Sequence, residues 1–157
     1  MSEVLQVEMS LVRDLMNANP WTARTDTPVR VLRQLMFDRH VRHIPIVTVD
    51  GRIRGLVSRS NLVQANPKRR RHYDEVVAAH VMQRELQTLT PEDGIDEAGR
   101  LLLDEGFDCL PVLDEKRRLV GLVSAEDFIR MMLRQEGPRV MESMIVRRAE
   151  GGYSIAI

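Results

Sequence analysis

The sequence predicts an α+β fold made of two β-α-β-β-α repeats that pack on each other as a pseudo-two-fold pair. The main observation is an ungapped internal repeat with an offset of 66 positions: His43-Ile44-Pro45-Ile46-Val47 and Gly55-Leu56-Val57-Ser58 return as Cys109-Leu110-Pro111-Val112-Leu113 and Gly121-Leu122-Val123-Ser124. Self-similarity at a fixed offset is the signature of a repeated structural unit. Each copy has only about fifty residues and buries little apolar surface alone, so we expect the two to share a core. The predicted parts are a lead-in (1–11), a first repeat (12–65), a basic linker (66–77), a second repeat (78–136) and a C-terminal tail (137–157).

The composition is that of a globular protein in a reducing compartment. Hydrophobic residues make up 43% and charged residues 29% of the 157, and 23 Lys and Arg balance 23 Asp and Glu. This balance gives no support to a general nucleic-acid or membrane-surface binder. No apolar stretch reaches the ~20 residues of a spanning helix, the N-terminus lacks the features of a secretion signal, and one cysteine makes no internal disulfide. We therefore expect a cytoplasmic protein without a membrane segment.

The first half of each repeat is predicted to be a strand followed by a helix. An extended segment lies around Thr22 in the first copy and Thr88 in the second. In the first copy Thr27 is the expected N-cap with Pro28 at the first helical position, and Asp93 is the expected N-cap in the second. Apolar residues at helical spacing follow both caps.

The second half of each repeat is predicted to be a β-hairpin followed by another helix. Gly106 suits the left-handed residue that often ends a helix, whereas His40, at the matching place in the first copy, suits that geometry less well. Asp50-Gly51 is a strong hairpin signal between two apolar runs. The second hairpin turns through Asp114-Glu115-Lys116-Arg117 without a glycine, so its turn is expected to be less regular.

A Gly-x-x-Ser-x-x-Asn/Asp motif closes each hairpin at the junction with the last helix. It contains Ser58 and Asn61 in the first copy and Ser124 and Asp127 in the second. One interpretation is a capping box that satisfies free backbone N–H groups. Another is a ligand site, because a helix N-terminus with a serine hydroxyl favours phosphate and a carboxylate accepts hydrogen bonds from a ribose diol. The two interpretations are compatible, and the repetition of the motif favours a ligand site.

The ordered pair of motifs resembles a tandem of CBS domains, named after cystathionine β-synthase, over residues 9–133. The resemblance rests on the Asp14-Leu15-Met16 lead-in, the His43–Val47 strand and the Gly-Leu-Val-Ser-x-x-Asn/Asp close of each copy. It implies a regulatory sensor of adenosine compounds such as AMP, ADP, ATP or S-adenosylmethionine. It also implies that Asp127 holds the ribose and that Ser124 faces the phosphates.

The resemblance predicts two sites that are not equivalent. Ser58 matches the family pattern, but Asn61 replaces the aspartate, so the first site is expected to be weaker or differently selective. Arg42 and His43 stand where family members place basic groups near phosphate, whereas the second copy has Asp108-Cys109 there.

The adenine is expected to lie near the first strand of each copy. Thr22 and Thr88 mark these strands, with Ile44 and Leu110 as candidate walls and Trp21 placed to join the contact. Aromatic residues make up only 4% of the chain, so stacking is not expected to dominate.

Other features favour no further chemistry. His40 and His43 lack companion ligands, so we predict no metal site, and Cys109 is expected to be a small buried side chain. The run Lys68–His72 is a solvated linker or, alternatively, a clamp for phosphates or an acidic partner, and it is too short to indicate a nucleic-acid role. No P-loop, nucleophile elbow or pair of catalytic acids is present, so we expect neither an enzyme nor a required cofactor.

The predicted function is a regulatory module that binds an adenosine-type ligand between its repeats and signals to a protein effector. The resemblance implies a homodimer, for which Met131, Met132 and Leu133 are candidate interface residues unless they belong to the core. Two alternatives remain open: a ligand-free dimerisation or interaction scaffold, and a regulatory fragment of a larger enzyme or transporter.

Overall fold

The computed structural model describes residues 11–64 and 75–135. In chain order the elements are α1 (Val12–Leu15), α2 (Val29–Arg39), β1 (His43–Val47), β2 (Ile53–Ser58), α3 (Arg59–Gln64), α4 (Ala78–Val81), α5 (Ile95–Leu103), β3 (Cys109–Leu113), β4 (Leu119–Ser124) and α6 (Ala125–Gln135). Residues 1–10, the Lys68–His72 run and the tail 137–157 lie outside the described residues. Within the described part, no helix is long and apolar enough to span a bilayer.

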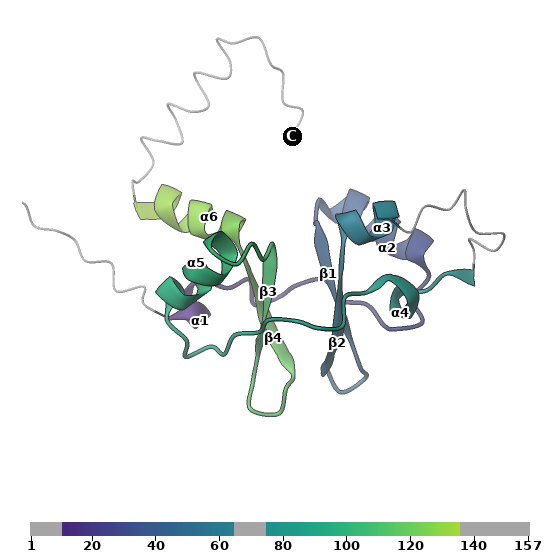
Figure 1. Cartoon of the computed structure of the whole chain (residues 1–157), viewed down its shortest axis with the longest axis horizontal. Helices are drawn as coiled ribbons and strands as arrows, with labels where there is room; N and C mark the ends of the chain where they lie inside the picture. The colour runs from purple at the N-terminus through teal and green to yellow at the C-terminus, as the bar shows by residue number, and fades with distance from the viewer. Residues whose placement is uncertain (1–10, 65–74, 136–157) are drawn as a thin grey trace, which may run out of the picture.

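Each repeat contains one antiparallel hairpin, and the two hairpins have the same register. His43 lies opposite Ser58 in β1–β2, and Cys109 lies opposite Ser124 in β3–β4. The hairpins occupy the middle of the molecule, and α2, α3, α5 and α6 lie above and to their outer sides in Figure 1. The α+β fold of two similar repeats is therefore confirmed.

The predicted first strand of each repeat is reduced to a single bridge. Ala23 forms a parallel bridge with Ile46, and Leu89 forms the equivalent one with Val112. The extended segment around Thr22 or Thr88 thus lies along the edge of its own hairpin without forming a longer strand.

The helix starts differ from the prediction by one residue. Pro28 and Gly94 are the N-caps of α2 and α5. Thr27 Oγ1 and Asp93 Oδ2 instead accept the backbone N–H three positions earlier, across 3.0 and 2.7 Å. Both side chains thus stabilise the turn before the helix. Gly106 (φ 72°) is left-handed as predicted, and His40 (φ 52°) takes the same conformation although it suits this geometry less well.

The second hairpin turn is as regular as the first, so the expected irregularity is wrong. Arg117 (φ 60°) takes the left-handed conformation that Gly51 (φ 84°) takes in the first turn. Gly51 N donates to Thr48 O and Arg117 N donates to Asp114 O, both across 3.0 Å. The left-handed conformation costs a non-glycine residue roughly 1–2 kcal/mol, and the matching register of the strands holds Arg117 in it.

The short helices α1 and α4 are exchanged between the repeats. Val12 N in α1 donates to Asp93 O of the second repeat, and Ala78 N in α4 donates to Thr27 O of the first, both across 2.8 Å. In Figure 1 the purple α1 lies beside α5 in the half formed by the second repeat, and the teal α4 lies in the half formed by the first. Each repeat is therefore completed by the first short helix of the other.

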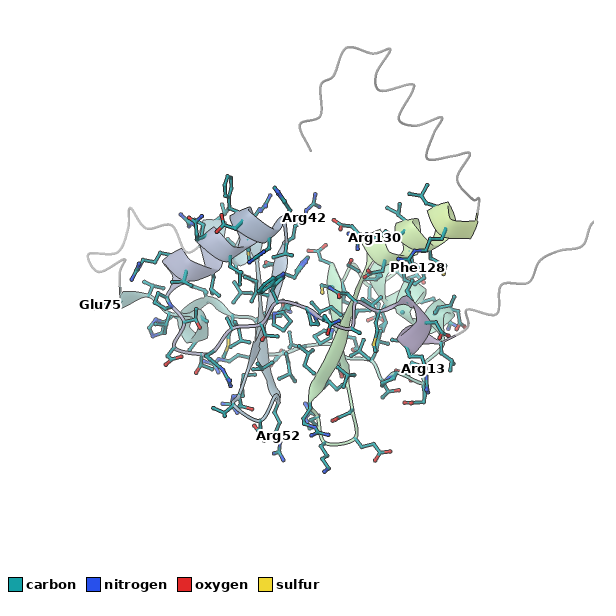
Figure 2. The ribbon with its side chains drawn as sticks, turned by 180° about the vertical axis from the view of Figure 1, so that it is seen from behind. Arg13, Arg42, Arg52, Glu75, Phe128 and Arg130 are labelled. Atoms are coloured by element: carbon teal, nitrogen blue, oxygen red, sulfur yellow. The ribbon has the colours of Figure 1, made fainter. Side chains whose placement is uncertain are left out.

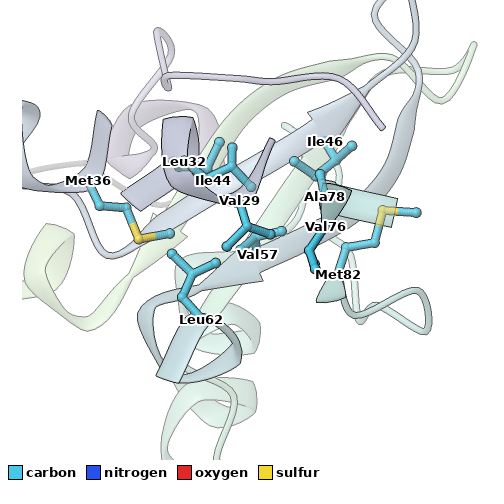
Figure 3. Packing of buried hydrophobic residues seen from close by; sticks show 10 residues of the cluster. All are labelled: Val29, Leu32, Met36, Ile44, Ile46, Val57, Leu62, Val76, Ala78 and Met82. Atoms are coloured by element: carbon cyan, nitrogen blue, oxygen red, sulfur yellow. The ribbon is translucent and has the colours of Figure 1, made fainter. Parts of the chain in front are cut away.

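The hydrophobic cores contain this exchange. Figure 3 shows the core of the first repeat, which combines residues of α2, the hairpin and α3 with three from the segment 76–82. Its ten buried members are Val29, Leu32, Met36, Ile44, Ile46, Val57, Leu62, Val76, Ala78 and Met82. The second core includes Val12 and Leu15 of α1. A third cluster of Leu56, Cys109 and Leu122 joins the two hairpins, and Cys109 is buried as predicted.

A methionine covers a glycine at each exchange point. A Cβ placed on Gly55 would lie 2.7 Å from Met82 Sδ and 2.9 Å from Gln83 O, and one placed on Gly121 would lie 2.5 Å from Met16 Sδ. Real Cβ contacts are longer than this, so only glycine lets the exchanged segment approach so closely. This packing accounts for both the repeated glycine and the repeated methionine.

Candidate functional site

The motif of the first repeat forms a complete capping box. Ser58 N donates to Asn61 Oδ1 across 2.8 Å, and Asn61 N donates to Ser58 Oγ across 3.1 Å. Both groups satisfy a backbone N–H at the start of α3, as the capping interpretation predicts.

The motif of the second repeat holds a buried carboxylate. Asp127 Oδ2 accepts from Ser124 N across 2.8 Å and from Ser124 Oγ across 3.2 Å, while Oδ1 lies 3.5 Å from Arg130 Nη1. Asp127 is 7% exposed and is the one charged or polar residue classed as buried among residues 11–64 and 75–135. A buried charge is costly unless it is paired, and here the two bonds from Ser124 and the Arg130 guanidinium supply that pairing.

A hollow of about 360 Å³ lies beside Asp127. Its walls come from the segment that begins in α1 and from one face of α6: Asp14, Leu15, Met16, Asn17, Ala18, Asp127, Arg130, Met131 and Arg134. Its volume falls within the range of small-molecule sites, about 300–1,000 Å³. The exchange of α1 brings residues of the first repeat to the motif of the second.

The hollow contains charges of both signs. Arg130 lies at the same upper end of the molecule as Arg42 in Figure 2. Its guanidinium is within 3.5 Å of Asp127 and 3.4 Å of Glu126. Asp14 adds a second carboxylate and Arg134 a second guanidinium to the walls. The site is therefore polar and roughly neutral, with groups able to bind hydroxyls and anions.

His43 is electrostatically coupled to the second repeat. Burial lowers its pKa, and the negative charge of Asp108 opposes this shift; Arg42 lowers the pKa and Glu126 raises it to smaller extents. The lowered pKa favours the neutral imidazole of His43, and the neighbouring Arg42 is the exposed cationic group at this position. No three His, Cys, Asp or Glu side chains in the described ranges are grouped to hold a metal ion.

Cys109 lies in the same region and is unreactive by environment. Burial, followed by the charges of Asp127 and Asp108, raises its pKa to about 12. The thiol therefore stays protonated at neutral pH, and the thiolate is the nucleophilic form.

The residues predicted to surround the adenine do not line the hollow. Ile44 and Leu110 are fully buried in the two cores, Thr22 is exposed and Thr88 is half-buried. Trp21 is 46% exposed, with the Arg39 guanidinium 4.4 Å from its ring centre. Of the predicted ligand residues only Asp127 lines this hollow; the roles of the others stay predictions.

The sequence prediction missed most of the walls, namely Asp14, Asn17, Ala18, Arg130 and Arg134. Residues 14–18 stand at the start of the first repeat, and only the exchange of α1 brings them to the second motif. The repetition of Met16 as Met82 was the available signal that the lead-in packs in a fixed place.

Comparison with known proteins identifies the family and agrees with the fold. A CBS-domain family model matches residues 12–68 and 77–134. The chain belongs to the CBS-domain family. A solved CBS domain pair in complex with 5′-methylthioadenosine and S-adenosyl-L-methionine is 22% identical with a TM-score of 0.69, covering 80% of this chain and 97% of that one. The protein CBSX2 in complex with AMP is 23% identical with a TM-score of 0.70, covering 80% of this chain and 98% of that one.

The curated relatives are longer proteins. A homoserine O-acetyltransferase from Methanosalsum zhilinae is 26% identical over 121 residues, which is 77% of this chain and 24% of that enzyme. Two further relatives are covered to 21% and 53% of their length. This CBS-domain chain thus spans between about a fifth and about half of these three proteins.

Proposed function

We propose that this CBS-domain chain is a regulatory module that binds an adenosine-type ligand, such as AMP, ADP, ATP or S-adenosylmethionine, in the hollow beside Asp127. The observation that carries the proposal is the buried Asp127 carboxylate at the wall of a 360 Å³ hollow built from both repeats. Solved CBS pairs of the same fold hold AMP or S-adenosyl-L-methionine, which supports this ligand class.

The chemistry of the site suits a nucleoside. The Asp127 carboxylate has lone pairs beyond its two bonds from Ser124, and charge-assisted hydrogen bonds to a ribose diol are roughly twice as strong as neutral ones. Ser124 stands at the start of the 11-residue α6, where free backbone N–H groups favour a phosphate. The apolar parts of Leu15, Met16 and Met131 offer a surface for the base.

Signalling in this proposal is a population shift. The hollow is walled by residues 14–18 and by α6, so a bound ligand ties the start of the first repeat to the last helix of the second. A ligand shifts an equilibrium only if it binds the two arrangements with different affinity. A change in the position of α1 or α6 would carry the signal to a protein effector.

The proposal includes a cytoplasmic homodimer without catalytic activity or a required cofactor. Exposed apolar side chains on the outer helices suit a second copy, among them Phe37 on α2 (73% exposed), Ile129 (55%) and Met132 (59%) on α6. A second candidate is the regulatory part of a larger enzyme or transporter, and the coverage of only 24% of the homoserine O-acetyltransferase favours it.

A thermal-shift screen with AMP, ADP, ATP, S-adenosylmethionine and GTP tests the proposal. A ligand at 100 times its Kd adds about 2.7 kcal/mol to the free energy of unfolding, which raises the midpoint of a domain of this size by about 5–10 °C. We expect a shift with at least one adenosine compound, its loss in Asp127→Ala and its retention in the matched control Asn61→Ala. A folded protein that shows no shift with any of these compounds is the ligand-free scaffold instead.

A further inference from the structure

Exposed apolar side chains occupy equivalent positions on the helices of the two repeats. Phe37 on α2 is 73% exposed, and Leu103 on α5, 66 positions later, is 85% exposed. Val63 on α3 and its counterpart Ile129 on α6 are 70% and 55% exposed. We call the outer side of α2, α3, α5 and α6, which lie above the hairpins and to their outer sides in Figure 1, the helical face. Large apolar side chains that gather on a surface mark an interaction site, and both halves of this face present the same pattern.

The two halves of the helical face differ in charge. Residues 29–64 contain seven arginines and two aspartates, a net charge of +5, whereas the equivalent residues 95–130 contain nine acidic and five basic residues, a net charge of −4. The hairpin turns 48–54 and 114–120 each contribute +1 to these values. The difference therefore comes from the helices and from the junctions between helix and strand.

The contrast is sharpest at the junctions that follow α2 and α5. Arg39 corresponds to Glu105 and Arg42 to Asp108, and all four residues are exposed. Arg42 lies at the upper end of the molecule in Figure 2. None of the four forms an ion pair with another residue of the ranges 11–64 and 75–135. These charges are therefore available to a partner.

A second copy of this chain complements both patterns. Two copies that dock by their helical faces around a two-fold axis have two orientations: like repeats together, or the first repeat of each copy on the second repeat of the other. The apolar residues fit either orientation, because both halves present them. The charges fit only the second, because the first brings arginine against arginine and carboxylate against carboxylate, and like charges across an interface oppose association. Every contact occurs twice in a two-fold dimer, which doubles the preference.

We infer that the chain forms a two-fold homodimer through its helical face, in the head-to-tail orientation that sets the first repeat of each copy on the second repeat of the other. The inference rests on the homodimer of the proposed function and adds its surface and its orientation. Apolar contacts supply the affinity, and the opposite charges of the two halves reject the head-to-head orientation.

Cross-linking between copies tests the orientation. Sedimentation of the full chain first establishes that it is a dimer. Val63→Cys and Ile129→Cys chains, one of them carrying a mass tag, are then treated with a short bismaleimide, separately and after exchange of subunits in a mixture. We expect cross-linked pairs only in the mixture, each containing one chain of either kind, because a head-to-tail dimer keeps the two copies of either position apart. The unchanged chain, whose Cys109 is buried, is the control and should give no cross-link.

Charge reversal tests what sets the orientation. Arg39→Glu places a carboxylate against the acidic half of the other copy, and we expect it to weaken the dimer about 5- to 30-fold, since the contact occurs twice. In a head-to-head dimer the same change would relieve repulsion instead. The double variant Arg39→Glu/Glu105→Arg restores opposite signs on the facing halves and should recover most of the affinity. Arg54→Glu, the same reversal at an exposed position of β2, is the matched control and should leave the dimer unchanged.

The outcomes separate the inference from the proposed function. Cross-links within either single variant alone, or a tighter dimer in Arg39→Glu, would overturn the head-to-tail orientation while the homodimer stands. A dimer that gives no cross-link in any mixture would overturn the helical face as its interface. A chain that sediments as a monomer would overturn the proposed homodimer and the inference together. A melt followed by circular dichroism verifies that each variant is folded.

Discussion

Alanine at Gly55 or Gly121 is a direct perturbation of the exchanged segments. A methyl group at Gly55 would lie 2.7 Å from Met82 Sδ, 2.8 Å from Met82 Cγ and 2.9 Å from Gln83 O. At Gly121 the distances are 2.5 and 2.9 Å to the same atoms of Met16, and 3.1 Å to Asn17 O. Each substitution therefore forces a methionine out of its place and presses on a backbone carbonyl.

The expected loss of stability follows from what has to move. Overpacking of this kind costs typically about 1–3 kcal/mol. The flexible methionine relieves part of the clash in both variants. The carbonyl of Gln83 is too close for a real Cβ contact, whereas that of Asn17 needs a shift of only a few tenths of an ångström. We therefore expect Gly55→Ala to be the more destabilising of the two.

Urea unfolding followed by circular dichroism measures both effects, with Gly99→Ala as the matched control. A methyl group at Gly99, inside α5, would lie 3.7 Å from ring atoms of Phe128, which is ordinary contact. Replacing a glycine inside a helix stabilises by roughly 0.5–1 kcal/mol. If Gly55→Ala and Gly121→Ala also raised the midpoint, the close approach of the exchanged segments would be refuted.

The two variants also differ in their effect on the proposed site. Met16 lines the hollow beside Asp127, and Met82 belongs to the core of the first repeat. Gly121→Ala is therefore expected to weaken binding of the adenosine ligand, and Gly55→Ala to leave it within about twofold once the fraction of folded protein is accounted for. Equal losses in both would contradict the placement of the ligand.

Further predictions concern single residues. Burial lowers the pKa of His43, so the native state binds fewer protons than the unfolded chain. The free energy of unfolding should therefore fall as the pH drops below about 6.5, by at most about 1.4 kcal/mol per pH unit. Urea titrations should show this slope reduced in His43→Asn and kept in the control His40→Asn. Arg117→Gly should raise the free energy of unfolding by about 1 kcal/mol because it removes the left-handed strain, and a loss of stability would mean that the Arg117 side chain is needed. Cys109 is 8% exposed and its pKa is raised to about 12. Its thiol should therefore react with a thiol reagent far faster in urea than in the native protein. Fast labelling of the native protein would contradict its burial.

Local signals in the sequence predicted the local structure well. Pro45 and Pro111 mark equivalent strands, Asp50-Gly51 forms the expected turn, and Gly106 takes the left-handed conformation after its helix. The turn at Arg117 was mispredicted because strand register, which is a property of the whole hairpin, fixed the conformation against the preference of the residue. The N-caps were displaced because Thr27 and Asp93 bond to the preceding turn instead.

The exchange of α1 and α4 between the repeats could not be predicted from sequence patterns. A helix of four residues has no periodicity that indicates which repeat it packs on. The motif alone pointed to Asp127, whose buried carboxylate is the centre of the candidate site. The opposite wall, residues 14–18, is far away in sequence and comes to Asp127 only through the tertiary fold.

The most direct test of the account is a crystal structure of the protein with the adenosine compound that stabilises it. We predict that the ligand lies between residues 14–18 and α6, with the ribose hydroxyls on Asp127. A ligand seated away from Asp127 would contradict the proposed site.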